Sequence, residues 1–247
     1  MEKKEFWAPE SLRRYLDACA FLDYPRVPLA KYVEGIIRPE DTVLDLGCGP
    51  GASSEYLATL CRQVWAVDTS QAGLDSLRER IAKKGTRNIT PLDQPFPQGE
   101  LPVCDVVVAL YVFFLLENRS AAKRLLELTG REGIILLRRE DRGFMEEIPP
   151  LLGLPARSTP CSRGCHIMGL LEGVGARVEC EHFQRDFGQP VADVREAADF
   201  IRAQLRAGEE YAQAIEELAP RYLVERQGRL YLPYPRTECV LHYWKDR

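Results

Sequence analysis

The apolar positions of this chain form helical stripes and short continuous runs that follow one another. Residues 1–38 carry two helical stripes, and the break between them falls at Pro25 and Pro28. From Thr42 the pattern changes to a short apolar run, TVLDLG, which ends in the glycine-rich GCGPG. A helix-like stretch through Leu60 comes next. This order predicts a strand, a glycine turn and a helix after a helical preface.

The alternation continues to the end of the chain. Ser70 is placed to cap a helix that ends at Gly85, and the run at 105–110 is almost wholly apolar, which is typical of a central strand buried on both faces. The other expected elements are strands at VWAVD, 88–91, GIILLRR, 176–183 and ECVLHYW, and helices over 118–129 (closed by Gly130), 167–174 (closed by Gly175), 194–205 and 211–218. This pattern predicts an α/β fold with a doubly wound parallel sheet and helices on both faces.

Composition narrows the function classes. The 247 residues are 28% charged and 45% hydrophobic, which is typical of a globular protein. The formal net charge of −4 disfavours nucleic acid as a partner. No apolar run is long enough to span a bilayer, and the start, MEKKEFWAPE, lacks the apolar region of a secretory signal, so we expect a cytoplasmic protein without membrane contact whose eight cysteines are reduced.

The first glycine turn is the expected ligand site, because ligands of open α/β sheets bind at the carboxyl ends of the strands. Its spacing is G-x-G-x-G, whereas dinucleotide folds use G-x-G-x-x-G. Asp45, two positions before the first glycine, would sit poorly beside a diphosphate but can face a positively charged ligand. Asp68 ends the second strand, where it can accept hydrogen bonds from a ribose diol.

The segments VLDLGCGPGASSEYLA and WAVDTS together resemble the first two motifs of the class I S-adenosylmethionine-dependent methyltransferases. The resemblance covers about residues 40–245. It implies a Rossmann-like, seven-stranded sheet whose last strand, ECVLHYW, is antiparallel, and it implies S-adenosylmethionine as the cofactor. The residues that it implies at the cofactor are Asp45, Gly47, Gly49 and Gly51 at the methionine and ribose, Cys48 as a small filler of the same loop, Asp68 at the ribose, Thr69 and Asp93 at the adenine, and Ala109, Leu110 and Tyr111 beside the methionine chain.

No catalytic residue stands out. Many relatives have histidines just beyond the fourth strand, whereas this chain has Phe113 and Phe114, which we expect in the core. Methyl transfer from a sulfonium can rely on positioning, so a base is optional. If the acceptor must lose a proton, Tyr111 and His166 are weak candidates, together with Glu140 and Asp141.

Cys161, Cys165 and His166 lie within six residues of one another. A structural zinc site needs four ligands, and no second pair with suitable spacing exists, so we expect a helix start without bound metal. Exposed thiolates at Cys161 and Cys165 leave open an acceptor such as arsenite or another thiophilic species.

For the domain organisation, we expect an N-terminal helical lid at 1–38 and a methyltransferase core at 39–247. Insertions at 142–163 and 189–236 would form the substrate cover, where Tyr231 and Tyr234 either line an apolar acceptor pocket or belong to a hairpin packed on the sheet. The leading function is methyl transfer to a small-molecule acceptor. A non-catalytic S-adenosylmethionine-binding regulator is an alternative, and the glycine spacing disfavours a nicotinamide dehydrogenase. The sequence leaves the oligomeric state open.

Overall fold

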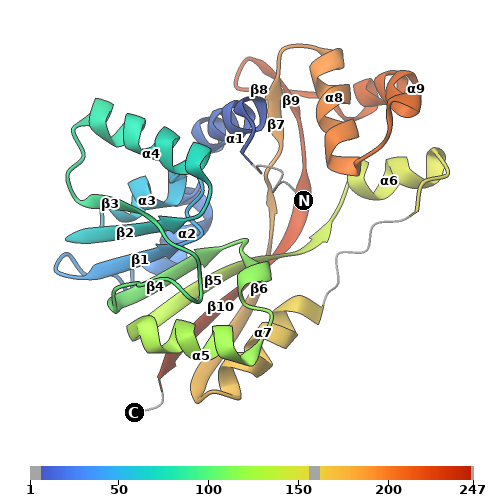
Figure 1. Cartoon of the computed structure of the whole chain (residues 1–247). Helices are drawn as coiled ribbons and strands as arrows, with labels where there is room; N and C mark the ends of the chain where they lie inside the picture. The colour runs from blue at the N-terminus through green and yellow to red at the C-terminus, as the bar shows by residue number, and fades with distance from the viewer. Residues whose placement is uncertain (1–6, 156–161, 246–247) are drawn as a thin grey trace. The chain divides into compact units, whose positions relative to one another are not determined.

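The computed structural model describes residues 7–155 and 162–245 (Figure 1). The chain divides into two compact units. The first consists of residues 1–137, 162–181 and 239–247, and the second of residues 138–161 and 182–238.

A seven-stranded sheet carries the first unit. Its strands are β1 (Thr42–Leu46), β2 (Gln63–Asp68), β3 (Ile89–Asp93), β4 (Cys104–Leu110), β5 (Thr129–Asp141), β6 (Ala176–Asp186) and β10 (Pro235–Lys245). The order is β3-β2-β1-β4-β5-β10-β6, with β10 as the antiparallel strand. β1 pairs in parallel with β2 on one side and with β4 on the other, so its carboxyl end lies between two strand ends of the same direction. The predicted Rossmann-like fold is confirmed.

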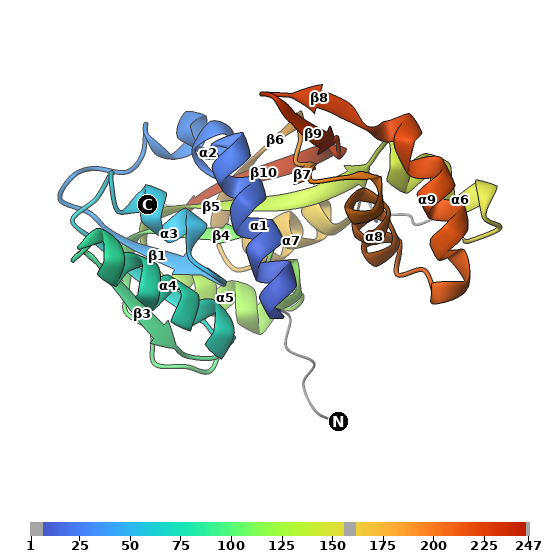
Figure 2. The same cartoon turned by 90° about the horizontal axis from the view of Figure 1, so that it is seen from above.

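Helices cover both faces of this sheet. Their bounds are α1 (Pro9–Leu22), α2 (Arg26–Val33), α3 (Ala52–Leu57), α4 (Gln71–Lys84), the short 3-10 helix η1 (Phe113–Leu115), α5 (Arg119–Leu128) and α7 (Ser162–Glu172). Figures 1 and 2 show α3 and α4 on one face and α5 and α7 on the other. The side chains of Val106, Val107 and Val108 on β4 are fully buried, because both faces of that strand are covered.

Side-chain caps are present at two helix starts, of which the one at Ser70 was predicted. The Ser70 hydroxyl accepts a hydrogen bond from the Gly73 amide at 3.2 Å, and Gly85 ends α4 with a φ of +68°. The Asn118 side chain accepts one from the Ala121 amide at 2.9 Å. These side chains satisfy backbone groups that have no partner within the helix.

The second unit has its own core and a smaller sheet. Its elements are α6 (Phe144–Leu151), β7 (Gln189–Val191), α8 (Val194–Leu205), η2 (Glu209–Tyr211), α9 (Ala212–Leu218), η3 (Ala219–Tyr222), β8 (Val224–Arg226) and β9 (Arg229–Leu232). The three strands form an antiparallel sheet in the order β7-β9-β8. The predicted helices over 194–205 and 211–218 are thus found here. The unit packs around Phe144, Ile201 and Leu232, which are fully buried.

Several boundaries differ from the prediction. Gly130 does not close a helix: α5 ends at Leu128, and Gly130 already belongs to β5, where a Cβ would lie 2.9 Å from the backbone oxygen of Cys104. Pro28 lies inside the first turns of α2, so the helical break falls before it. α3 is short and ends before Leu60.

Helix α6 and the short strand β7 were not predicted. Helix α6 includes Pro149 and Pro150, which made its sequence look unlike a helix. The predicted hairpin is present as β8–β9, which pairs with β7 in the smaller sheet. Short strands of three or four residues carry too little pattern to be recognised from the sequence.

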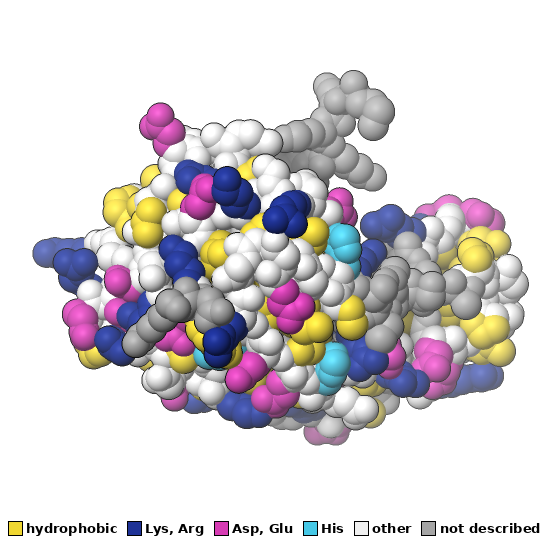
Figure 3. All heavy atoms as spheres, turned by 90° about the horizontal axis from the view of Figure 1, so that it is seen from below, with side chains coloured by type: hydrophobic (Ala, Val, Ile, Leu, Met, Phe, Trp, Pro, Cys, Tyr) yellow, Lys and Arg dark blue, Asp and Glu magenta, His cyan; other side chains and the backbone are white. Residues whose placement is uncertain are grey.

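The described residues contain no helix that is both long enough and apolar enough to cross a membrane. On the face of the molecule in Figure 3, Lys and Arg side chains are interspersed with Asp and Glu side chains. That face therefore presents no extended surface of a single charge.

Candidate active site

The glycine loop after β1 has the backbone conformation that the sequence predicts. Gly47, Gly49 and Gly51 have φ values of +72°, +52° and +77°, in the left-handed region that side chains with a Cβ disfavour. The loop ends at the start of α3, whose first backbone amides have no partner within the helix. The loop therefore presents bare backbone at the carboxyl end of β1.

Close neighbours add a second requirement for these glycines. A Cβ at Gly47 would overlap the side chain of Val112, and one at Gly51 would overlap that of Leu77. Val112 follows β4 and Leu77 belongs to α4. The loop is thus held between the segment after β4 and the helix after β2.

Asp68 joins the ends of β1 and β2. One carboxylate oxygen accepts a 2.7 Å hydrogen bond from the Gly49 amide, and the other accepts from the amides of Thr69 and Ser70 at 2.7 and 2.8 Å. Asp93 is the register partner of Asp68 on β3. Two acidic residues therefore end neighbouring parallel strands beside the glycine loop, where a carboxylate can accept hydrogen bonds from vicinal hydroxyls.

Asp45 is 1% exposed, and one of its oxygens accepts hydrogen bonds from the hydroxyls of Ser53 and Ser54 at 2.7 and 2.6 Å. Burial is the largest cause that raises its pKa from 3.8 to about 6, against the two serine hydrogen bonds, which lower it. The carboxyl group fastens the end of β1 to α3. This role was missed in the sequence, where Asp45 was expected to face a charged ligand.

The other residues expected at the cofactor differ in exposure. Cys48 is buried, and burial raises the pKa of its thiol well above the ordinary value, as suits a small filler. Ala109 and Leu110 are buried at the end of β4, whereas Thr69 and Asp93 are exposed. Exposure leaves those two side chains accessible to a ligand.

Tyr111 carries backbone strain immediately after β4. Its φ is +59°, a left-handed conformation that is uncommon for a residue with a bulky side chain. The Tyr111 amide donates a 2.8 Å hydrogen bond to the carbonyl of Leu136 on β5. Strain of this kind concentrates at functional positions, because the surrounding structure must hold it in place.

The two phenylalanines beyond Tyr111 have different surroundings. Phe113 is partly buried against the main core, and the guanidinium of Arg163 lies 3.9 Å from its ring centroid. Phe114 is 59% exposed, so the expectation that it belongs to the core was wrong. The described structure thus gives Phe113 a cationic neighbour from this chain.

Each candidate base has a described contact with a neighbouring group. His166 is exposed, and its Nε2 lies 3.2 Å from the carbonyl oxygen of Glu117. In the second unit, Glu140 pairs with Arg142 at 3.0 Å, and Asp141 pairs with Arg138. None of these contacts marks its residue as a proton acceptor.

Tyr231 and Tyr234 were candidates for an apolar acceptor pocket, and Cys161 and Cys165 were expected at a helix start. Tyr231 and Tyr234 are 1% and 2% exposed, so they pack inside the second unit rather than line an open pocket. Cys165 is exposed at the start of α7, and Cys161 lies outside the described residues.

Trp7 is a site residue that the sequence analysis did not identify. A Cβ at Gly49 would lie 2.9 Å from Cζ2 of the Trp7 indole, and one at Gly73 would lie 3.3 Å from its Cδ1. The ring also packs on Tyr15 of α1, with centroids 5.0 Å apart. An indole from the N-terminal segment thus covers the glycine loop. A tryptophan before a helix carries no pattern that predicts such a contact.

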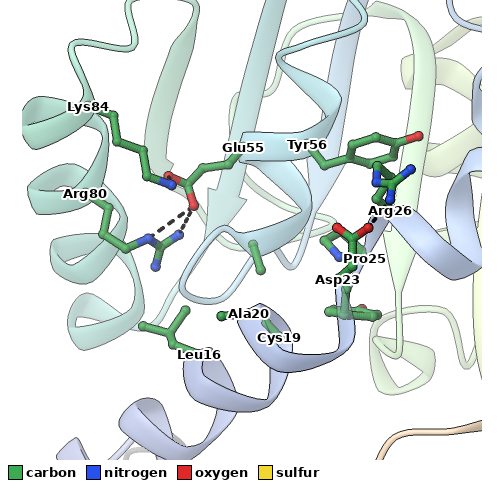
Figure 4. Close-up of a pocket in the computed structure, with 12 residues that line it drawn as sticks. Leu16, Cys19, Ala20, Asp23, Pro25, Arg26, Glu55, Tyr56, Arg80 and Lys84 are labelled. Atoms are coloured by element: carbon green, nitrogen blue, oxygen red, sulfur yellow. Dashed lines mark hydrogen bonds and ion pairs between the residues drawn. The ribbon is translucent and has the colours of Figure 1, made fainter. Parts of the chain in front are cut away.

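A cavity of about 410 Å³ lies beside this region, between α1, α3 and α4 (Figure 4). Glu55 lines the cavity and forms ion pairs with Arg80 and Lys84, each at 2.8 Å. Asp23 and Arg26 form a second ion pair. Its lining contains none of the residues expected at the cofactor, although Ala52 directly follows Gly51 of the glycine loop.

Comparisons with known proteins agree with this geometry. Residues 43–132 match a family model described as a methyltransferase domain. A 52-residue segment, 21% of this chain, is 36% identical to a probable cobalt-precorrin-6B C(15)-methyltransferase (decarboxylating) of Methanococcus vannielii. A 75-residue segment, 30% of the chain, is 33% identical to an uncharacterized protein of Haemophilus influenzae. These matches span only 29% and 28% of the two relatives.

Solved structures share the fold over most of the chain. The YcgJ protein of Bacillus subtilis superposes with a TM-score of 0.61 at 12% identity, covering 90% of this chain and 99% of that protein. A SAM-dependent methyltransferase of Aquifex aeolicus gives a TM-score of 0.53 at 18% identity, covering 93% and 98%. At these identities the likeness concerns the fold.

Proposed function

We propose that this chain, which carries a class I S-adenosylmethionine-dependent methyltransferase domain, transfers a methyl group from S-adenosylmethionine to a small-molecule acceptor. The observation that carries the proposal is the contact between Asp68 and Gly49, which brings an acidic strand end against a loop of bare backbone. The G-x-G-x-G spacing favours this cofactor over a dinucleotide.

Each residue of the site has a proposed role. Asp68 would accept the ribose hydroxyls, and Asp93 and Thr69 would lie at the adenine. Gly47, Gly49 and Gly51, with Cys48 as filler, would let the methionine and ribose approach the backbone. Ala109, Leu110 and Tyr111 would line the methionine chain. The negative charge of Asp45 would favour a cofactor that bears two positive charges.

Positioning would supply the catalysis. Bound S-adenosylmethionine supplies a methyl group on a sulfonium, from which the neutral thioether S-adenosylhomocysteine departs as a good leaving group. Alignment of the two reactants is worth on the order of 7–11 kcal/mol in favourable cases. The strained backbone at Tyr111 would hold its side chain at the edge of the site, where its hydroxyl can orient an acceptor or its phenolate can take the acceptor's proton.

The acceptor would be enclosed by the parts outside the core. We place the N-terminal lid at 1–38, where Trp7 already covers Gly49, and the substrate cover in the insertions 142–163 and 189–236. The Methanococcus relative is a probable cobalt-precorrin-6B methyltransferase, so a tetrapyrrole belongs among the compounds to be tested.

Calorimetric titration tests the cofactor directly. We expect S-adenosylmethionine and S-adenosylhomocysteine to bind with micromolar affinity and NAD not to bind. Binding of NAD without a response to S-adenosylhomocysteine would overturn the proposal.

A non-catalytic role is the second candidate. It is favoured by His166, Glu140 and Asp141, whose described contacts do not suit a proton acceptor. Release of S-adenosylhomocysteine in the presence of a panel of carboxylate, amine, phenol, tetrapyrrole and arsenite acceptors separates the two. Turnover with any of them supports transfer, whereas tight cofactor binding without turnover supports a regulator.

A further inference from the structure

A pair of thiols in the first unit lies outside the proposed cofactor site. Cys180 belongs to β6, at the edge of the sheet, and is exposed. Cys239 belongs to the neighbouring strand β10 and is 2% exposed. Their Sγ atoms are 3.2 Å apart, at hydrogen-bonding distance. An atom bound to the exposed Cys180 sulfur would therefore lie close to the Cys239 sulfur.

Helix α7 closes over this pair. A Cβ at Gly164, in the first turn of α7, would lie 3.1 Å from the Cys239 sulfur. Glycine thus leaves the sulfur room that a larger residue would take. The first turn of a helix also carries the positive end of the helix dipole, which stabilises thiolates. The pair consequently has one accessible sulfur, one shielded sulfur and a favourable electrostatic setting.

The separation of the sulfurs selects among ligands that bind two thiols. A tetrahedral zinc ion with bonds of about 2.3 Å holds its sulfurs about 3.8 Å apart, and a two-coordinate linear ion holds them farther apart. Trivalent arsenic is pyramidal, with bond angles nearer a right angle, so its two sulfurs lie closer together than in either metal site. The 3.2 Å separation of the two sulfurs is closer to the separation in a trivalent arsenic site than to that in either metal site.

We propose that Cys180 and Cys239 form a dithiol site for trivalent arsenicals. An arsenoxide, written R–As=O, condenses with the two thiols to form two As–S bonds. The oxygen leaves as one molecule of water with both thiol protons. Arsenic stays trivalent, so the step requires no oxidant or reductant. The proposal concerns binding and does not rest on the proposed methyl transfer.

Cys19, Cys48, Cys61 and Cys104 are buried, so none of them offers an exposed thiol for a first As–S bond as Cys180 does. Burial raises the pKa of Cys61 to about 11 and that of Cys104 to about 12, and it raises the pKa of Cys48 well above its ordinary value. Cys165 is exposed and serves as the matched control for an accessible thiol. The pair thus differs from the Cys161 and Cys165 thiols that the sequence suggested for a thiophilic species.

Phenylarsine oxide is a suitable probe, with the full chain kept reduced by a phosphine. We expect an adduct of one arsenical per chain by intact-mass spectrometry, loss of two titratable thiols, and reversal by ethanedithiol. Cys180→Ser should weaken binding by about 100-fold or more, because the second bond is then no longer intramolecular. Cys165→Ser should bind as the parent does.

Cys180→Ser is the decisive variant, because Cys180 is exposed and its replacement leaves the core intact. Cys239→Ala serves as the second variant, with circular dichroism to confirm that it folds. Unchanged affinity in Cys180→Ser, or an adduct that maps by peptide mass to Cys161 and Cys165, would overturn the assignment.

Discussion

The Asp68 carboxylate accepts a 2.7 Å hydrogen bond from the backbone amide of Gly49, and this contact joins the ends of two parallel strands. The donor is a backbone amide, so the interaction depends on the positive φ of Gly49, which glycine adopts without steric cost. Because the same carboxylate also accepts from Thr69 and Ser70, its orientation is set before any ligand arrives. Such preorganisation reduces the free-energy cost of binding.

Replacing Asp68 by alanine should weaken S-adenosylhomocysteine binding by about 2 kcal/mol or more, because the ribose hydroxyls would lose a charged acceptor in a partly buried site. Calorimetry measures the change. Asp75→Ala is the matched control, since Asp75 is an exposed acid on α4 that pairs with Arg78. If Asp68→Ala binds as tightly as the parent, the cofactor does not lie at the end of β2.

Cofactor affinity should depend on pH through Asp45, whose pKa burial raises to about 6. Because the folded protein holds this proton more tightly than the unfolded chain, the contribution of Asp45 to stability is full below about pH 4 and is lost as pH rises through 6. A cationic cofactor favours the ionised carboxylate, so affinity for S-adenosylmethionine should rise with pH until about 6 and then level off.

Asp45→Asn removes the titratable carboxyl group and should make the affinity for S-adenosylmethionine independent of pH in this range. The ligand-free variant should also be more stable than the parent to thermal unfolding at pH 7. Calorimetry between pH 5 and 8 gives both profiles. The same slope in the parent and in Asp45→Asn would show that another group titrates, and Asp45 would then have only its role in fastening α3.

Trp7 should report cofactor binding. Its indole contacts Gly49, so a ligand in the loop must change the surroundings of the ring. We expect S-adenosylhomocysteine to shift or quench the intrinsic fluorescence of the parent, and Trp7→Phe to lose most of that signal. Trp244→Phe is the control, because Trp244 lies on β10, near the end of the chain. An equal signal from Trp7→Phe would remove Trp7 from the site.

The ion pair between Arg131 and Asp41 should contribute to stability. Asp41 is 3% exposed, lies 2.6 Å from the guanidinium, and also accepts a 2.8 Å hydrogen bond from the Arg38 amide. Arg131→Met leaves that carboxylate buried without its cation, so the free energy of unfolding should fall by about 3 kcal/mol.

Urea denaturation measures the loss from Arg131→Met. Arg124→Met is the control, because the pair of Arg124 with Glu127 is more exposed and 3.6 Å apart, and such pairs contribute less than about 1 kcal/mol. Equal effects of the two substitutions would contradict a special role for the buried pair.

The sequence by itself determined the order of strands and helices in the main sheet, because each of those elements repeats a local period that burial requires. The run at 105–110 predicted a central strand since both faces must be apolar, and Ser70 and Gly85 marked the ends of α4 through short-range hydrogen bonding. The spacing of Gly47, Gly49 and Gly51 likewise predicted the loop, because positive φ is a property of single residues.

Only the tertiary structure decided which side chains contact one another. Asp45 turns to Ser53 and Ser54, Trp7 covers Gly49, and Cys180 meets Cys239 across two strands. None of these has a local pattern, because each depends on which strands and helices become neighbours and on which side chains then compete for the same space. Local periodicity specifies the elements, and packing specifies the partners of each side chain.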